Sequence, residues 1–273
     1  MLKTKVLKEG PGVPIVFLHG FLGRSEDWLE VCASLPPCRC IGIDLPGHGD
    51  SPFEPDFTID LPQFHLVGYS MGGRIALQKF KDKALTLTLL STHPGLKDAE
   101  ERDARRESDA VWAKKLLHLP IDEFLKQWYD QPIFKPFINR DGKKVTICAS
   151  EATPDQSEAG RVSGVNSKTI DPRARIDMAK PQQADCHFFT APVNGPRISM
   201  RREQNVVSLA KALLHFSLAH QPRFEIDHVI VGERDLKFKT LFLNPIVVPG
   251  AGHMVHLENP KAIAKIIEER VKL

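Results

Sequence analysis

The sequence has no apolar run long enough to cross a membrane and no long run of like charge. Although 42% of the 273 residues are hydrophobic, none of the apolar stretches reaches the ~18 residues that a membrane-spanning helix needs. The net charge is only +3, and the basic residues are interleaved with acidic ones. Nucleic-acid-binding proteins usually carry a continuous basic surface. We therefore expect neither a membrane protein nor a nucleic-acid-binding protein.

Cysteine is scarce, and its spacing fits neither a disulfide framework nor a metal site. The five cysteines are Cys32, Cys38, Cys40, Cys148 and Cys186. They form no CxxC pair and no Cys/His spacing of the kind that zinc requires. A metal or redox pair at Cys38 and Cys40 would need further ligands that the sequence does not offer. We expect reduced thiols and no metal.

The N-terminal segment also lacks the features of a secretory signal. Residues 1 to 14 are basic but contain no apolar stretch and no small-residue cleavage site. We expect the mature chain to begin here and the protein to be cytoplasmic. The length suits one large domain, or a core domain with an inserted cap.

Apolar stretches of strand length recur along the chain, and each ends in turn residues. They occupy residues 14–20, 40–49, 64–70, 85–95, 226–235 and 244–253. Their continuous apolar character predicts strands buried on both faces, and helical patterns at 25–35 and 72–83 lie between several of them. This alternation predicts an α/β fold with a mostly parallel sheet. Ligands of such folds bind at the carboxyl ends of the strands.

Residues 96–222 interrupt the alternation and predict an inserted helical cap. Helical patterns occupy 98–117, 121–131 and 205–219. Between them, residues 138–198 are polar, rich in Pro, Gly and Ser, and show no sustained period, which predicts a mobile or disordered insert. The predicted domains are a core of residues 1–95 and 223–273 and a cap of residues 96–222.

Ser70 lies in a G-x-S-x-G motif directly after a predicted strand and directly before a predicted helix. A sharp strand-to-helix turn brings backbones together, which explains why Gly68 and Gly72 carry no side chains. The motif in this context indicates a nucleophile elbow, with the serine hydroxyl held above the sheet. The alternative is a serine that only caps the helix.

Two further residues complete a candidate catalytic triad. His253 follows the last predicted strand and can accept the proton of a serine, because the pKa of histidine lies close to 7. Asp235 ends the preceding strand and would orient the imidazole. The chain order Ser70, Asp235, His253 is that of the α/β-hydrolase fold.

Other residues compete for these roles. His256 is the alternative base. Glu233 and Asp227 are alternative acids, although Asp227 lies at the wrong end of its strand, and Asp235 could be a solvated loop carboxylate.

A candidate oxyanion hole lies at the end of the first apolar stretch. The backbone N–H groups of Phe21 and Met71 are expected to point at developing negative charge. His19, beside Phe21, is interpreted as a structural hydrogen-bonding residue.

Seven segments of the chain carry a more specific pattern. They are HGFLGRSEDW (19–28), DLPGHGDS (44–51), GYSMGGR (68–74), HPGLKDAEERDARRESDAVW (93–112), WYDQPIF (128–134), GERDLKF (232–238) and GAGHMVHLENP (250–260). Together they closely resemble the MenH family, the 2-succinyl-6-hydroxy-2,4-cyclohexadiene-1-carboxylate synthases of the α/β-hydrolase superfamily. The resemblance implies a menaquinone-biosynthesis lyase with an α/β-hydrolase fold. Such an enzyme eliminates pyruvate from 2-succinyl-5-enolpyruvyl-6-hydroxy-3-cyclohexene-1-carboxylate without a cofactor.

The resemblance also implies which residues bind this small polycarboxylate substrate. Arginines matching Arg74, Arg105 and Arg201 are expected to bind carboxylates, and residues matching Tyr69 and Trp128 line the family's pocket. Arg74 lies one helical turn after the nucleophile, so it should point back toward the site.

Each of these residues also has a structural interpretation. From the residues alone, Arg105 would be a surface residue paired with Glu101 at i,i+4. Tyr69 and Trp128 could equally be core residues.

The proposed chemistry uses the Ser70 alkoxide as a general base that removes a ring proton, without acylation of the serine. One alternative is a serine esterase or carbon–carbon bond hydrolase that uses the same triad through an acyl or gem-diol intermediate. Another is a non-catalytic binding protein. Residues 52–63 contain three prolines, so the full helix that the family has there is predicted to be absent or reduced to one turn.

Overall fold

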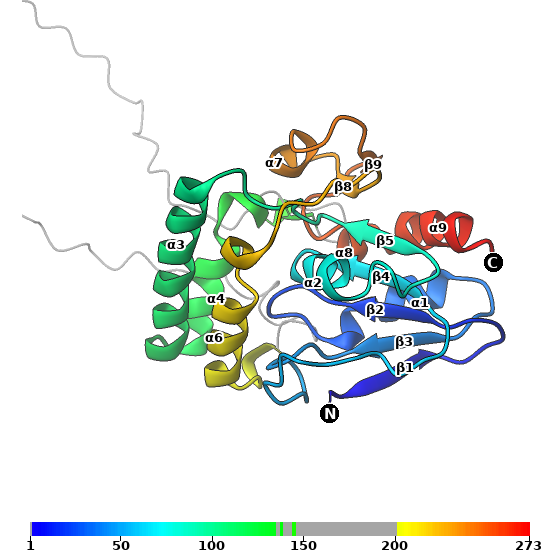
Figure 1. The fold of residues 1–273 in the computed structure, drawn as a ribbon, viewed down its shortest axis with the longest axis horizontal. Coiled ribbons are helices and arrows are strands. Elements are labelled where there is room, and N and C mark those ends of the chain that lie inside the picture. The colour runs from blue at the N-terminus through cyan, green and yellow to red at the C-terminus, as the bar shows by residue number, and fades with distance from the viewer. Residues whose placement is uncertain (1, 135–136, 139–143, 146–200) are drawn as a thin grey trace, which may run out of the picture.

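The computed structural model of the protein describes residues 2–134, 137–138, 144–145 and 201–273. Its largest element is a seven-stranded sheet with the order β1-β3-β2-β4-β5-β8-β9 (Figure 1). The strands are β1 (Thr4–Lys8), β2 (Ile15–Leu18), β3 (Cys40–Ile43), β4 (His65–Tyr69), β5 (Leu87–Leu90), β8 (Ile230–Gly232) and β9 (Ile246–Val248). Only β1 runs antiparallel to its neighbour within this sheet. The predicted α/β fold with a mostly parallel sheet is confirmed.

Alternate residues of β2 pack into two different cores, one on each face of the sheet. Ile15 and Phe17 pack into a core shared with α1 (Leu29–Ser34) and α9 (Pro260–Val271). Val16 and Leu18 point the other way, into a core shared with α2 (Met71–Lys79). All four side chains are fully buried. A strand with two buried faces has no polar face, which is why its sequence reads as continuously apolar.

The first of these cores also contains the described cysteines. Cys32, Cys38 and Cys40 are free and fully buried, with the sulfur atoms of Cys38 and Cys40 3.8 Å apart. Burial raises the pKa of Cys38 to about 12, and the hydrogen bond with Cys32 raises the pKa of Cys40. Because the thiolate is the reactive form, these thiols belong to the packing of the core. Cys148 and Cys186 lie outside the described residues.

Three helices pack together beyond one end of the sheet (Figure 1). They are α3 (Ala99–His118), α4 (Ile121–Tyr129) and α6 (Val206–His215), which match the three predicted helical patterns. Their apolar side chains, including Leu116, Phe124 and Leu209, form one buried cluster with Leu22 of the core. Figure 1 shows the arrowheads of β3 and β5 directed towards these helices. The carboxyl ends of the parallel strands therefore lie beneath this helical layer.

The predicted irregular insert at 138–198 lies outside the described residues except at residue 138 and residues 144–145. There, β6 (Phe137–Ile138) pairs with β7 (Lys144–Val145) in an antiparallel arrangement.

Residues 52–63, all of which the structure describes, contain no helix. Phe53, Phe57, Ile59 and Leu61 from this segment pack against the core on the α2 side. The prediction that a full helix is absent here is confirmed, and apolar side chains from an irregular segment cover the sheet in its place.

The sequence interpretation missed several elements and placed the ends of two helices too late, since α6 ends at His215 and not at residue 219. It missed β1, an edge strand in which all residues are exposed or half-exposed. Such a strand shows little apolar pattern in the sequence. The interpretation also missed the one-turn helices α7 (Leu236–Lys239) and α8 (Val255–Glu258). Helix α2 ends at Lys79, before the predicted end at residue 83. None of the described helices combines the length and apolar character needed to span a bilayer.

Candidate active site

Ser70 occupies a strained turn between β4 and α2. Its φ of 50° and ψ of −111° lie outside the regions that a non-glycine residue normally adopts. A Cβ on Gly72 would lie 2.4 Å from the carbonyl oxygen of His19, and a Cβ on Gly68 would lie 2.6 Å from the Cα of Gly73. Ser70 is the N-cap residue of α2, all of which the structure describes, and its side chain makes no capping hydrogen bond to this helix. The geometry is that of a nucleophile elbow and not of a capping serine.

His253 and Asp235 form a buried pair at the ends of neighbouring strands. The Nδ1 atom of His253 lies 2.6 Å from Oδ2 of Asp235, and each residue is 3% exposed. Asp235 is held in turn by the N–H of Phe238, which donates to its Oδ1 at 3.3 Å. An Nδ1–H that donates to a carboxylate leaves Nε2 as the nitrogen that can accept a proton. Asp235 is therefore not a solvated loop residue.

The loop that carries His253 is held by two residues that the sequence interpretation did not identify. The carboxylate of Glu258 accepts hydrogen bonds from the N–H groups of Gly252 and Met254, at 2.7 and 3.1 Å. The hydroxyl of Ser91 donates to the carbonyl oxygen of His253 at 2.9 Å. Burial raises the pKa of Glu258. The signal that could have identified Glu258 is its position directly before Asn259, the N-cap of α9. No sequence signal pointed to Ser91.

The competing residues have other contacts. His256 is 1% exposed and lies between the rings of Tyr69 and Trp28, with centroid distances of 4.3 and 4.6 Å. The carboxylate of Glu233 accepts from the N–H of Gly250 at 2.8 Å. The contact with Asp235 belongs to His253, which makes His253 the better candidate for the base.

The segment expected to form an oxyanion hole lies against the elbow. A Cβ on Gly20 would lie 3.5 Å from the Cβ of Ser70 and 2.6 Å from the ring of Tyr69, so the backbone of residue 20 passes close to the serine. Met71 is the first residue of α2, where N–H groups have no partner inside the helix. Phe21 directly follows Gly20 and Met71 directly follows Ser70, so both residues belong to the two segments that meet at the elbow.

His19 has the structural role that its position suggested. It is fully buried, and its Nε2 accepts the N–H of Leu45 at 2.9 Å while its Nδ1 lies 2.7 Å from the carbonyl oxygen of Gly20. These contacts require a neutral ring that donates through Nδ1. Burial lowers the pKa of His19, which favours the same neutral form.

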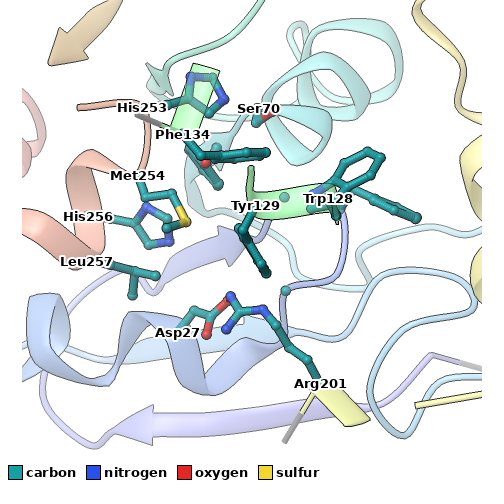
Figure 2. Close-up of a pocket in the computed structure, with 14 residues that line it drawn as sticks. Asp27, Ser70, Trp128, Tyr129, Phe134, Arg201, His253, Met254, His256 and Leu257 are labelled. Atoms are coloured by element: carbon teal, nitrogen blue, oxygen red, sulfur yellow. The ribbon is translucent and has the colours of Figure 1, made fainter. Parts of the chain in front are cut away.

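A cavity of about 50 Å³ joins most of the predicted residues (Figure 2). Its lining includes Phe21, Tyr69, Ser70, Trp128, Arg201 and His253. Trp128 reaches it from α4 and packs against Phe21, with ring centroids 4.9 Å apart. Phe134, from the short helix η2 (Pro132–Phe134), contacts the ring of His253 edge-on at 5.8 Å. The cavity therefore lies between the strand ends and the helical layer.

One of the three predicted arginines lies at this cavity. Arg201 is 5% exposed, and its Nη2 donates to Oδ2 of Asp27 at 3.1 Å. Its guanidinium carbon lies 5.8 Å from the ring centroid of Tyr129. Asp27, which also lines the cavity, is a residue that the sequence interpretation did not single out.

The described lining of the cavity does not include Arg74 or Arg105. Arg74 is buried, and its Nη1 donates to the carbonyl oxygen of Phe216 at 2.7 Å. Burial and the positive charge of Arg105 lower the pKa of Arg74. The Nε of Arg105 donates to Oδ1 of Asp109 at 2.8 Å. The alternative pairing of Arg105 with Glu101 is wrong, because the carboxylate of Glu101 turns back to accept the N–H of Lys97 at 2.7 Å.

In the part of the chain that the structure describes, no group of three or more His, Cys, Asp or Glu residues is placed to hold a metal ion.

The chain is similar to known proteins over nearly its whole length. The model of the family described as "Alpha/beta hydrolase family" matches residues 15–266. The 2-succinyl-6-hydroxy-2,4-cyclohexadiene-1-carboxylate synthase of Enterobacter sp. (strain 638) is 29% identical, with 100% of this chain and 97% of the relative covered. The synthase of the same name from Klebsiella pneumoniae is 28% identical, with 96% of each chain covered.

Solved structures show the same fold at lower identity. The structure of MenH from S. aureus has a TM-score of 0.68 and 20% identity, with 98% of this chain and 97% of the other covered. The enol-lactonase from Burkholderia xenovorans LB400 has a TM-score of 0.60 and 14% identity, with 100% and 96% covered.

Proposed function

The chain belongs to the alpha/beta hydrolase family, and from this premise we propose that it is a lyase of menaquinone biosynthesis. The reaction is that of a 2-succinyl-6-hydroxy-2,4-cyclohexadiene-1-carboxylate synthase, which removes pyruvate from 2-succinyl-5-enolpyruvyl-6-hydroxy-3-cyclohexene-1-carboxylate. The observation that carries the proposal is a buried Asp235–His253 pair beside a strained Ser70, in a cavity that also holds Arg201. The names of the full-length relatives support the same reaction.

The triad supplies the base. His253 takes the proton of Ser70 at Nε2, and Asp235 stabilises the imidazolium that forms. The Ser70 alkoxide then removes a ring proton of the substrate, a ring double bond forms, and the carbon–oxygen bond to the enolpyruvyl group breaks. The leaving enolate takes up a proton to become pyruvate. A covalent ester on Ser70 during turnover would contradict this sequence of steps.

The backbone beside Ser70 supplies electrostatic stabilisation. The N–H groups of Phe21 and Met71 face the negative charge that develops as the ring proton leaves, because both lie next to the elbow. Fixed donors in a site that excludes water are worth more than the same donors in water.

The arginines bind the carboxylates of the substrate at two places. Arg201 acts inside the cavity, with Tyr69 and Trp128 as walls. Arg74 and Arg105 form a second cationic region, close enough for Arg105 to lower the pKa of Arg74. A polyanionic ring compound can place a carboxylate in each of the two regions, whereas a neutral ester has no negative charge to pair with the arginines.

Residues 96–222 act as the cap of this site in the proposal, on a core of residues 1–95 and 223–273. The cavity of about 50 Å³ is smaller than the roughly 300–1,000 Å³ of typical ligand pockets. The side chains of α4 and η2 must therefore move outward when the substrate binds.

A serine esterase or carbon–carbon bond hydrolase is the second candidate. It is favoured by the triad geometry, which also suits attack of Ser70 on a carbonyl carbon, and by the likeness in fold to an enol-lactonase and to esterases. The cationic groups argue against a neutral ester as its substrate.

One assay distinguishes these functions. The purified chain is offered the enolpyruvyl precursor and, separately, a chromogenic phenyl ester, and the release of pyruvate and of phenolate is measured. Pyruvate release supports the lyase. Phenolate release alone favours the hydrolase, and neither product favours a non-catalytic binding protein.

A further inference from the structure

Asp27 is an acidic residue inside a cavity proposed to bind a polyanion. It lies on the short helix η1 (Ser25–Trp28), is 5% exposed and lines the cavity beside Ser70 and His253. A carboxylate in this position repels the carboxylates of the proposed substrate. Its presence therefore needs a physical reason.

The carboxylate of Asp27 is held by its own segment. The N–H of Arg24 donates to Oδ2 at 3.3 Å, and a Cβ on Gly23 would lie 2.9 Å from the same oxygen. The absence of a side chain at Gly23 leaves room for this oxygen. Asp27 is therefore a fixed acceptor and not a mobile surface acid.

The partner of Asp27 comes from a distant part of the chain. The Nη2 of Arg201 lies 3.1 Å from Oδ2 of Asp27, and both side chains are more than nine-tenths buried. Figure 2 shows the carboxylate and the guanidinium facing each other in the cavity, with Tyr129 next to them. Because a guanidinium is a planar group with five N–H donors, a carboxylate that binds one nitrogen limits the directions in which the other donors can point.

We propose that Asp27 is a positioning residue that orients the Arg201 guanidinium for a carboxylate of the substrate. Asp27 touches Arg201 and not the reacting atoms. This inference rests on the proposed function for the identity of the substrate, but the contact that it describes does not depend on the chemistry that follows.

A double-mutant cycle tests the proposal, because the effect of Asp27→Asn on succinate binding should change sign when Arg201 is replaced. The proteins are wild type, Asp27→Asn, Arg201→Met and the double variant. The readouts are the KM and kcat for pyruvate release from the precursor and, independently of turnover, the Kd of succinate by calorimetry. Asparagine keeps the shape of the side chain and an oxygen acceptor but removes the charge.

In the presence of Arg201, we expect Asp27→Asn to raise the KM of the precursor and the Kd of succinate by about tenfold, the size of typical couplings between contacting residues. We expect kcat to change less. In the Arg201→Met background, the effect of Asp27→Asn on the Kd of succinate should reverse, because Asp27 is then a buried negative charge without the Arg201 guanidinium. There, Asp27→Asn should lower the Kd of succinate.

The neighbouring ion pair provides a matched control. Arg202 follows Arg201 directly, and its Nε lies 2.5 Å from Oδ1 of Asp122, outside the lining of the cavity. The variants Arg202→Met and Asp122→Asn should leave the Kd of succinate within about twofold, as expected for an exposed pair.

Three results overturn the proposal. Tighter succinate binding by Asp27→Asn with Arg201 intact would mean that Asp27 only weakens the field of the arginine. Losses of the same direction in both backgrounds would indicate a general structural role. A wild-type chain that binds neither succinate nor the precursor would leave Arg201 with no anion to hold.

The role of Asp27 can still be decided if the wild type is inactive or if one variant does not fold. If the wild type releases no pyruvate but succinate binding shows the reversal, the proposed function fails and the role of Asp27 stands. If Asp27→Asn alone does not fold, the comparison of the double variant with Arg201→Met still gives the sign of the Asp27 effect.

Discussion

The triad and the three arginines of this protein are held in place by different kinds of contact. Ser70 is fixed by backbone crowding at Gly68 and Gly72. The carboxylate of Asp235 accepts the backbone N–H of Phe238, and the carboxylate of Glu258 accepts two N–H groups of the loop that carries His253. The crowding of Gly72 by His19 and the hydrogen bond from Ser91 to His253 join segments that are distant in sequence, but all of these contacts lie at the ends of the strands.

The arginines are held by distant or exposed partners. Arg74 donates to the carbonyl oxygen of a residue 142 positions away, and Arg201 to a carboxylate 174 positions away. Arg105 is one-third exposed in its pair with Asp109. The catalytic geometry therefore depends on contacts at the ends of the strands, whereas the binding of the substrate depends on how the helical layer packs on the core.

Replacement of the base should give the largest effect. We expect His253→Ala to reduce kcat/KM for pyruvate release by about 10³-fold, because Ser70 loses its proton acceptor. His256→Phe, a change in a second histidine of the described cavity lining, should retain activity within about tenfold, because its ring packs between the rings of Trp28 and Tyr69 and an aromatic replacement keeps this packing. Steady-state kinetics measure both. Equal losses would mean that the contact with Asp235 does not select the base.

The second-largest effect should come from a substitution that adds crowding at the turn of Ser70. Gly72→Ala would place a Cβ within 2.5 Å of the backbone carbonyl oxygens of Leu18 and His19. Because backbone of β2 cannot move away cheaply, we expect a loss of about 3 kcal/mol in the free energy of unfolding. Urea denaturation measures it, with the exposed Gln78→Ala on the same helix as the control. A loss below about 1 kcal/mol would show that the turn can relax.

The buried Asp44 tests whether backbone donors also hold the loop next to Asp27. Burial opposes its ionisation, but the N–H groups of Ser25 and Asp50 stabilise the carboxylate and lower its pKa from 3.8 to about 2. A lowered pKa adds stability that is present above pH 3.8 and is lost as the pH falls through 2.

We expect Asp44→Asn to lower the free energy of unfolding at pH 7 by about 2 kcal/mol and to flatten its dependence on pH below 4. Denaturation at several pH values measures this. An unchanged acid dependence would place the titrating group elsewhere.

The smallest effect should come from Arg105. If it binds a carboxylate equally in the ground state and the transition state, Arg105→Ala raises KM about tenfold and leaves kcat within about twofold. Arg106→Ala, at the exposed neighbouring arginine that pairs with Asp103, should change neither. An unchanged KM in Arg105→Ala would confine carboxylate binding to the cavity.

The sequence predicted the features that depend on neighbours along the chain. The strands β2, β4 and β9 and the turn at Ser70 all follow from local patterns. The resemblance to a family added the arginines, which no local pattern identifies as ligands. Their predicted roles stay predictions.

The remaining features depend on tertiary contacts. Nothing near Arg201 in the sequence indicates Asp27 as its partner, and nothing near Arg105 distinguishes Asp109 from Glu101, since both lie four residues away. The structure decides the second case because Glu101 is drawn to the start of its helix by the N–H of Lys97. β1 was missed because an edge strand buries little of its surface and therefore shows little apolar pattern.

Whether Ser70 is the base can be measured as the rate of pyruvate release from the enolpyruvyl precursor by Ser70→Ala. The substitution removes one oxygen atom and leaves the pair of His253 and Asp235 in place. If Ser70 is the base, the rate falls about 10³-fold or more below that of the wild type, and the circular dichroism spectrum is unchanged. A Ser70→Ala protein that releases pyruvate at the wild-type rate would contradict this role of Ser70.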